Sequence, residues 1–308
     1  MNIFIVWLKQ IRANFLILAV LLVLIGVSLA YRYLEVAHNM HLFKIALLIT
    51  GVVLAHVSVN LFNEYSDFRT GTARVTGRAL FHIENSMLAS GYTKPSTVLA
   101  IAVITLMAAT FIGIYFTLTA HWTLMLFILV GGFAIVTYKD FLTGKLWGEL
   151  FSGLTFGSLV VIGSYVALSA SPMDRIWQLV PLSVWLVAIP PGLLTTLLLL
   201  VHQSPANDLE ANRLTHYHIK TPGSSINTSF YIAGALITFG SIILLPFTES
   251  GSVWMLLALI PMPFLISSVK IILFQQGNNH GMVTAIRRNI LSVLLTDALL
   301  ALSVFLST

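Results

Sequence analysis

The most informative segment of the chain reads Asn60-Leu61-Phe62-Asn63-Glu64-Tyr65-Ser66-Asp67-Phe68-Arg69-Thr70-Gly71 and ends an otherwise apolar run. Here His56, Asn60, Asn63 and Asp67 recur at steps of four, three and four residues, and Glu64 lies one turn beyond Asn60. On a helix this spacing places all five side chains on one stripe. Polar helix ends often reach lipid headgroups, but two carboxylates and two amides exceed what an interface needs. Because polar groups are costly in hydrocarbon, we expect the stripe to face a cavity or partner helices.

Composition places the chain among integral membrane proteins. Of its 308 residues, 57% are hydrophobic and 9% are charged, and the mean hydropathy is +0.93, as is typical of that class. The chain contains no cysteine, which excludes disulfides, thiolate chemistry and cysteine-ligated zinc. An apolar run over 15–30 follows Lys9 and Arg12 without a clear cleavage site, so we expect a retained first span.

Hydropathy predicts nine membrane spans, each near the ~20 residues that a bilayer core requires. The predicted spans cover roughly 14–31, 43–63, 95–117, 122–138, 150–170, 178–202, 226–246, 252–274 and 289–306. We therefore expect an all-α, polytopic membrane helix bundle in which residues 1–308 form a single domain. The short apolar start, residues 1–8, is expected to lie along the membrane interface.

Positive charges orient this bundle. With the N-terminus in the cytoplasm, all Lys and Arg residues except Arg32, Lys44 and Arg175 fall on the cytoplasmic side. The bias predicts a multi-pass protein of the cell inner membrane whose N-terminus and polar loops are cytoplasmic. It also accounts for the net charge of +5, which is therefore no argument for a nucleic-acid partner. The lipid bilayer is the partner that the composition predicts.

A second polar segment, residues 202–213, follows the sixth span. Its Gln203, Asn207 and Glu210 share a helical face, Asp208 lies to one side, and Pro205 interrupts the hydrogen-bond ladder. Four spans separate the two segments, so both open on the same side of the membrane. Two acidic, amide-rich helix ends on one side suggest a divalent-cation site, and Mg²⁺ prefers such hard oxygen ligands.

Four basic residues on that side could supply charge to a diphosphate. They are Arg69, Lys139, Lys145 and Arg213. Taken alone, each of them is better explained by membrane topology or by a contact with lipid headgroups. Asp297, inside the ninth span, is also expected to face inward, but neither polar segment reaches it and we assign it no further role.

The first segment resembles a signature of the UbiA superfamily of intramembrane prenyltransferases, most closely its 1,4-dihydroxy-2-naphthoate polyprenyltransferase branch in menaquinone biosynthesis. That signature reads Asn, two residues, Asn-Asp/Glu-Tyr, one residue, Asp, three residues and Gly. It is filled here by Asn60, Asn63, Glu64, Tyr65, Asp67 and Gly71. Further matches are Gly91, Lys94-Pro95, Thr97, Tyr138, Gly148-Glu149, Phe156-Gly157, Gly163 and Pro191-Gly192-Leu193-Leu194. The resemblance covers about residues 10–300.

The second segment departs from the family pattern of a polar pair followed by two Asp residues four apart and then Gly. His202-Gln203 supplies the polar pair, but Ala206 stands at the first Asp position and Leu214 at the Gly position. Glu210 keeps a carboxylate at the second Asp position, and Asp208 matches an extra acid seen in some members. The second segment is therefore a degenerate version of the family motif.

The resemblance implies Mg²⁺-dependent transfer of a polyprenyl group from an allylic polyprenyl diphosphate to an aromatic acceptor, with 1,4-dihydroxy-2-naphthoate as the expected acceptor. It implies that Asn63, Glu64 and Asp67 hold one magnesium ion and that Asp208 and Glu210 hold another, and these five are the expected catalytic residues. The expected substrate contacts are Asn60, Tyr65, Arg69, Tyr138, Lys139, Lys145, His202, Gln203, Asn207 and Arg213. For Tyr138 an outward position in the interfacial aromatic belt is an equal alternative.

Two other functions stay open at this point. Ala206 and Leu214 fit a family member that binds prenyl diphosphate or quinone without turnover. A transporter would also carry polar residues and proline-broken helices inside the membrane, but its site is expected at the midplane. The polar groups here gather at one membrane face, which favours the enzyme.

Overall fold

The computed structural model describes residues 2–33, 42–71, 86–143, 145–202, 228–248, 251–274 and 279–307. Within these ranges nine helical segments are long and apolar enough to cross a membrane. The segments are Ala13–Arg32, Leu42–Arg69, Pro95–Thr119, Leu124–Leu142, Leu146–Ser169, Leu182–Val201, Thr228–Phe247, Val253–Phe274 and Gly281–Leu306. The nine spans predicted from hydropathy are thus confirmed, and so is the all-α class.

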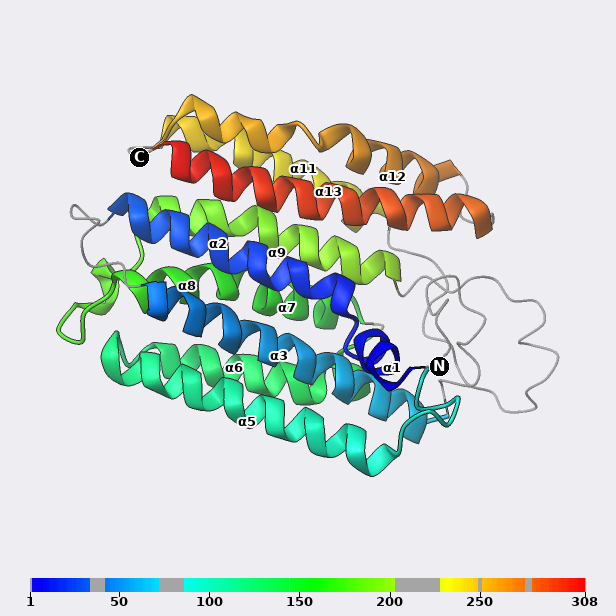
Figure 1. Cartoon of the computed structure of the whole chain (residues 1–308). Coiled ribbons are helices and arrows are strands. Elements are labelled where there is room, and N and C mark those ends of the chain that lie inside the picture. The colour runs from blue at the N-terminus through cyan, green and yellow to red at the C-terminus, as the bar shows by residue number, and fades with distance from the viewer. Residues whose placement is uncertain are drawn as a thin grey trace.

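The helices lie side by side as one bundle, with α2 (Leu16–Tyr33) and α9 (Leu182–His202) at its centre (Figure 1). On one side, α2 contacts α13 (Asn279–Leu306), and α9 contacts both α13 and α11 (Thr228–Leu244). Helix α12 (Met262–Phe274) packs on α13 and α11. On the other side, α2 contacts α3 (Leu42–Arg69) and α8 (Ser158–Ser169), while α9 contacts α7 (Leu146–Phe156). The outer helices α5 (Pro95–Thr119) and α6 (Leu124–Thr137) then cover α3.

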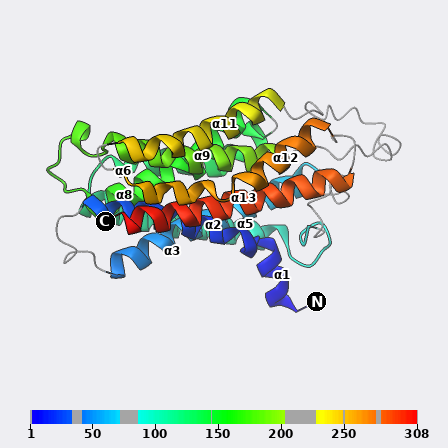
Figure 2. The same ribbon diagram turned by 90° about the horizontal axis from the view of Figure 1, so that it is seen from above.

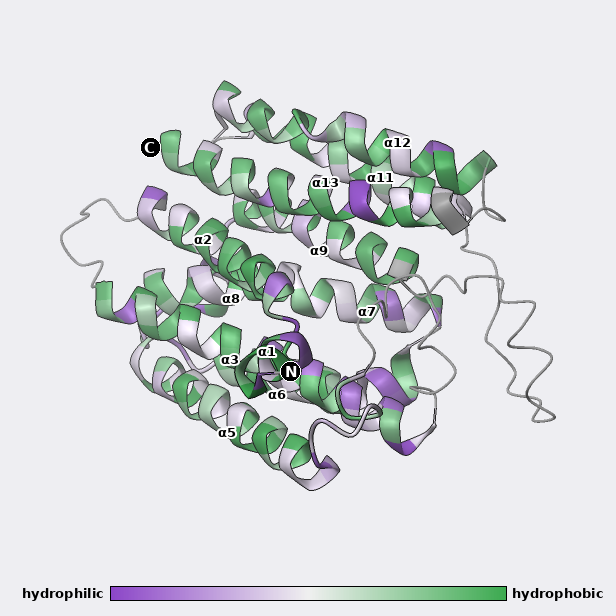
Figure 3. Ribbon diagram, turned by 45° about the vertical axis from the view of Figure 1, so that its right-hand side comes forward, coloured by the Kyte–Doolittle hydropathy of each residue, from purple (hydrophilic) through white to green (hydrophobic). Residues whose placement is uncertain are grey.

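Figure 3 shows that apolar residues cover most of each helix, with hydrophilic residues gathered near the helix ends. This distribution is the one that a bilayer imposes, because charged side chains are expensive at membrane depth. Exposed apolar side chains such as Phe111, Leu129 and Leu236 lie on the outer helices and would face lipid. The bundle is therefore apolar both in its core and on its outer surface.

Small residues bring α7 and α9 close together. A Cβ atom added at Gly157 would lie 2.7 Å from the Cα of Gly192, and one at Gly153 would lie 2.5 Å from the backbone nitrogen of Thr196. The Ser158 hydroxyl donates a hydrogen bond to the carbonyl of Ala188 at 2.7 Å. Close approach through small residues is a common way to pack membrane helices, since little apolar driving force exists between them in lipid.

The N-terminal helix α1 (Ile3–Gln10) leaves the bundle at a steep angle, as Figure 2 shows. The break between α1 and α2 is made at Arg12, whose φ of 53° lies in the left-handed region. Ile3 and Phe4 expose 60% and 65% of their surface. An exposed apolar face suits the expected interfacial position, which stays a prediction.

Candidate functional site

Helix α3 carries the first motif from Asn60 to Asp67, because it continues to Arg69 and does not end at 63 as hydropathy indicated. Its polar members Asn63, Glu64, Ser66 and Asp67 are only 5–9% exposed. The expectation that the polar stripe faces the protein interior is thereby confirmed for these residues. A hydropathy scale ends the span too early because it counts every polar side chain as a penalty, although these side chains are buried inside the bundle.

The motif glycine explains how α3 ends. The backbone N–H and the hydroxyl of Thr70 both donate to the carbonyl of Ser66, at 2.9 and 2.8 Å, in the last turn of the helix. Gly71 follows with a φ of 76°, a left-handed conformation that glycine adopts without steric cost. The chain therefore leaves the helix directly after the polar stripe.

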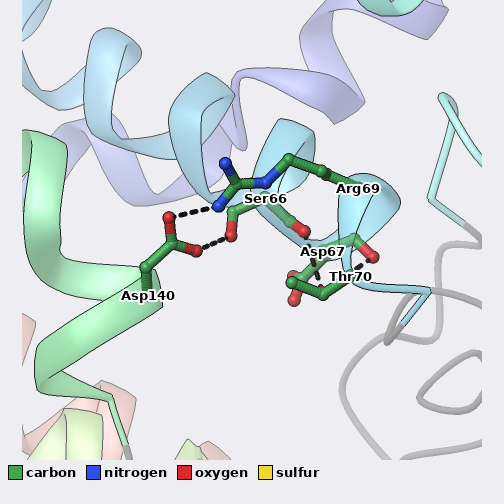
Figure 4. A network of polar contacts seen from close by, with 5 residues as sticks. All are labelled: Ser66, Asp67, Arg69, Thr70 and Asp140. Carbon is green, nitrogen blue, oxygen red and sulfur yellow. Dashed lines mark hydrogen bonds and ion pairs between the residues drawn. The ribbon is translucent and has the colours of Figure 1, made fainter.

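A single π-helical turn, η3 (Tyr138–Leu142), follows α6 and faces the end of α3. The Lys139 Nζ lies 3.0 Å from Asp67 Oδ1, an ion pair that lacks hydrogen-bond alignment. Asp140 accepts hydrogen bonds from the Ser66 hydroxyl and from Arg69 Nη2, the latter at 2.6 Å (Figure 4). Ser66 and Asp67, which are adjacent in α3, thus pair with Asp140 and Lys139, which are adjacent in the turn. We call Asn63, Ser66, Asp67, Arg69, Lys139 and Asp140 the first-motif site.

A cavity of about 170 Å³ opens within this site. Its polar lining comes from Asn63, Tyr65, Ser66, Arg69, Lys139 and Asp140. The Asn63 Oδ1 is buried and has no hydrogen-bond partner among the described residues. A buried amide oxygen without a partner is costly, so it points to a ligand that the cavity accepts.

Glu64 faces a different neighbour. Its Oε1 accepts hydrogen bonds from the backbone N–H of Leu88 at 3.0 Å and from the Ser86 hydroxyl at 3.1 Å. These bonds hold the turn that leads into α5, where Gly91 adopts a φ of 76°. One carboxylate oxygen of Glu64 is therefore engaged in structure, and its role as a magnesium ligand stays a prediction.

Asn60 also faces away from the cavity. Its amide donates to the carbonyl of Ile11 at 2.9 Å and so ties α3 to the break between α1 and α2. Beside it, the buried Gln10 donates to the Thr93 hydroxyl at 3.1 Å. The expected contact of Asn60 with substrate stays a prediction, and its visible role is to anchor the N-terminal segment.

Tyr138 is buried inside the bundle, in disagreement with the alternative of an outward aromatic belt. Its hydroxyl donates to Glu149 Oε2 at 3.1 Å, and Glu149 is itself only 1% exposed. The Tyr138 ring meets Phe156 edge-on at 6.3 Å between centroids, and Phe156 meets His56 at 6.1 Å. This aromatic series connects the polar end of the site with the middle of the bundle.

A second, apolar cavity of about 190 Å³ lies among α3, α5, α6, α7 and α8. His56 and Phe156 line it, and Ile135 lines both this cavity and the polar one. The two cavities are therefore neighbours, one charged and one apolar. Together they suit a ligand with a charged head and an apolar tail.

The remaining predicted site residues are dispersed or lie outside the described ranges. Tyr65 lines the polar cavity, whereas Lys145 is exposed at the start of α7. His202 is the last residue of α9. Gln203, Asn207, Asp208, Glu210 and Arg213 lie outside the described residues. Convergence of the two polar segments accordingly stays a prediction.

A magnesium ion is compatible with the donors in the first-motif site. Among the described residues, no three His, Cys, Asp or Glu side chains form a group that could hold a metal ion. Mg²⁺, however, is usually bound by one or two carboxylates together with substrate phosphates and water. The buried oxygens of Asn63 and Asp67 meet that pattern in part, and substrate oxygens or the second segment would complete it.

The sequence analysis missed Ser66 and Asp140. The serine fits no motif position, and Asp140 follows Lys139 at the end of the fourth span, where only the basic residue was selected. A usable signal was present, since an acidic residue on the same side as Arg69 is a potential ion-pair partner. The sequence alone did not indicate which basic residue it would meet.

Comparisons with known proteins concern the family and the fold of the chain. The model of the UbiA prenyltransferase family matches residues 19–284. The 1,4-dihydroxy-2-naphthoate octaprenyltransferase of Bacillus subtilis (strain 168) is 30% identical over 179 residues, which cover 54% of this chain and 52% of that protein. The match thus spans about half the length of this curated relative.

Two solved structures share the fold. A digeranylgeranylglyceryl phosphate synthase structure aligns with a TM-score of 0.59 at 14% identity over 99% of each chain. A UbiA homologue from Archaeoglobus fulgidus, bound to DMAPP and Mg²⁺, aligns with a TM-score of 0.50 at 13% identity over 96% of this chain and 98% of that one. At these identities the similarity establishes the fold alone.

Proposed function

The chain belongs to the UbiA prenyltransferase family, and from this premise we propose that it transfers a polyprenyl group from an allylic diphosphate to an aromatic quinone precursor within the membrane. The proposed acceptor is 1,4-dihydroxy-2-naphthoate, which the name of the Bacillus subtilis relative contains. The observation that carries the proposal is the pair of buried oxygen donors, Asn63 and Asp67, beside two basic side chains and next to an apolar cavity.

Asn63 and Asp67 are the described residues that would hold Mg²⁺, with Glu64, Asp208 and Glu210 as further proposed ligands. When bound, the metal supplies positive charge that neutralises the diphosphate and favours its departure. The side chains of Asn63 and Asp67 place hard oxygen donors at fixed positions on one rigid helix. The solved structure of the Archaeoglobus fulgidus homologue is bound to DMAPP and Mg²⁺, which supports the same cofactor here.

Arg69 and Lys139 are proposed to bind the diphosphate oxygens. Both line the polar cavity, and both carry N–H donors that form strong hydrogen bonds with phosphate. Arg69 is the more exposed of the two, with a side chain 58% accessible compared with 26% for Lys139. Arg69 is therefore suited to meet an entering diphosphate and Lys139 to hold it deeper in the site.

The neighbouring apolar cavity is proposed to take the first units of the prenyl chain. Its lining is mainly aliphatic and aromatic, and it meets the polar cavity at Ile135. Tyr138 and Phe156 lie close to this junction, and their ring faces can stabilise a developing allylic cation through their π electrons. A buried reaction centre of this kind also limits attack on the cation by water.

The positive charge bias supports a multi-pass inner-membrane protein with this site on the cytoplasmic side. Lys139, Arg69 and Lys94 all belong to the helix ends on that side. The prenyl substrate would then enter from the bilayer and the soluble diphosphate would leave toward the cytoplasm. The proposed partners are accordingly polyprenyl diphosphate, the aromatic acceptor and lipid.

The deciding experiment is a transfer assay on purified protein with Mg²⁺, farnesyl diphosphate and 1,4-dihydroxy-2-naphthoate. We expect prenylated product from the wild type and none from Asp67→Asn. Asp174→Asn is the matched control. Asp174 lies in an exposed loop, and among the described residues its carboxylate accepts a hydrogen bond from the nearby Ser171 N–H. The control variant should retain full activity.

Two other results would contradict the proposal. Mg²⁺-dependent binding of farnesyl diphosphate without any product would favour the non-catalytic binder that Ala206 and Leu214 suggest. In that case Ala206→Asp should restore turnover. Absence of both binding and turnover would overturn the metal–diphosphate site itself.

A further inference from the structure

The first-motif site contains two ion pairs that use all of its described charged side chains. Lys139 pairs with Asp67, and Arg69 pairs with Asp140. The same basic residues are the proposed ligands of the diphosphate, and Asp67 is a proposed ligand of the metal. Each charged side chain of the first-motif site is thus already paired with a group of opposite charge.

We infer that Lys139 is an exchangeable counter-ion: it occupies Asp67 Oδ1 until a divalent cation takes that oxygen, and it then pairs with the diphosphate that accompanies the cation. The inference rests on the proposed function, and it states how the two ligands of the same site influence each other. Divalent cation and diphosphate would bind cooperatively, because each supplies the partner that the other displaces.

The first argument concerns space and charge. Asn63 and Lys139 line the same cavity, so a cation held by Asn63 and Asp67 would lie next to the Lys139 ammonium. Two positive charges at contact distance repel each other, and the repulsion is stronger at a partly buried site than in bulk water. The ammonium must therefore leave Asp67 Oδ1 when the cation binds there.

The second argument concerns how easily Lys139 can move. Its contact with Asp67 is an ion pair without hydrogen-bond alignment, and its side chain is 26% exposed at the cavity. Lysine carries its charge on a flexible four-carbon chain, which allows the ammonium to change partners without backbone movement. The buried Asp67, only 5% exposed, stays in place on α3.

The third argument concerns where Lys139 goes. Asp140, its neighbour in the chain, already accepts hydrogen bonds from Ser66 and Arg69. Asp140 is thus a poor new partner for the ammonium. A diphosphate in the cavity offers several anionic oxygens and is the acceptor that remains.

The exchange predicts that loss of the Lys139 charge changes the affinities for the two ligands in opposite directions. Removing the Lys139 charge should strengthen binding of a divalent cation alone, because nothing competes for Asp67. The same change should weaken binding of the diphosphate, because one of its cationic partners is lost. A merely structural role for Lys139 would weaken both.

The test uses purified full-length protein in detergent and two probes, Mn²⁺ alone, counted by electron paramagnetic resonance, and inorganic pyrophosphate at saturating Mg²⁺. For Lys139→Gln we expect the Kd of Mn²⁺ to fall about fivefold and the Kd of pyrophosphate to rise about fivefold, the range expected for one partly exposed ion pair. Lys139→Met, equally neutral, should shift both constants in the same directions. Lys94→Gln, an exposed lysine at the same end of the bundle, should change neither.

Asp67→Asn separates failure of this inference from failure of the proposed function. If Asp67→Asn loses Mn²⁺ but neither Lys139 variant gains affinity, the exchange is wrong and the metal site stands. If Asp67→Asn binds Mn²⁺ as the wild type does, Asp67 is no metal ligand and the proposed function loses its central observation. A parallel loss of both probes in the Lys139 variants would also overturn the exchange, by showing a structural role.

Discussion

Two buried polar regions of this bundle differ in what their side chains bind. In the first-motif site, charged groups line a cavity and pair across α3 and η3. In the second region, which we call the C-terminal polar core, Tyr231, Ser268 and Asn289 bond to one another from α11, α12 and α13. All three are fully buried and uncharged.

The comparison shows that burial of polar groups is not sufficient evidence for a site. The C-terminal polar core joins helices, since Ser268 also donates to the carbonyl of Ala285 at 3.0 Å. Interhelical hydrogen bonds of this kind stabilise membrane bundles without any ligand. The first-motif site differs because it contains ion pairs and its side chains border a cavity.

Two aspartates provide the largest contrast. Asp67→Asn should lower the rate of prenyl transfer about 10²–10³-fold, the usual effect of removing one group that stabilises charge in a transition state. Asp297 is fully buried on α13, and Asp297→Asn should leave that rate unchanged. Initial rates at saturating substrates would measure both. An equal loss in the two variants would remove the distinction between the regions.

Two arginines give the second contrast. Arg69→Gln removes a proposed diphosphate ligand and should raise the KM for farnesyl diphosphate about tenfold, since a hydrogen bond to a charged group is worth about 1.5–3 kcal/mol. Arg288 donates to the Ser267 hydroxyl near the C-terminal polar core. Arg288→Gln should leave that KM unaltered. Steady-state kinetics in farnesyl diphosphate would distinguish the two, and a larger effect at Arg288 would place the diphosphate elsewhere.

Two tyrosines give the smallest contrast in rate and the clearest one in stability. Tyr231→Phe removes the hydroxyl that joins Ser268 and Asn289, so the free energy of unfolding should fall by about 1–3 kcal/mol while the rate per folded molecule is kept. Tyr138→Phe should instead lower the rate about threefold to tenfold, because the ring loses the hydrogen bond to Glu149 that orients it. Thermal unfolding in detergent and initial rates would test this pair. Similar profiles for the two variants would contradict it.

The spans were predictable because the bilayer imposes one simple requirement on length and hydropathy. The end of α3 was not predictable, because burial of Asn63, Glu64 and Asp67 depends on the helices that pack around them. The family was predictable from the spacing of the first motif, and the family match over 19–284 confirms it. The inward position of Tyr138 was left open by the sequence, since hydropathy does not distinguish a buried ring from an interfacial one.

The amino-acid order alone determined that the chain crosses a membrane as helices and that one helix end carries oxygen donors on a single face. Both follow from local periodicity, which needs no knowledge of neighbours. The tertiary structure decided which donors reach a common cavity and which are engaged in structure. Glu64 and Asn60 hold neighbouring segments, whereas Asp67 pairs with Lys139 and Asn63 lines one cavity together with Lys139 and Asp140. The physical reason is that ion pairs and cavities form between segments about seventy residues apart, and only the packing of α3 against η3 brings those segments together.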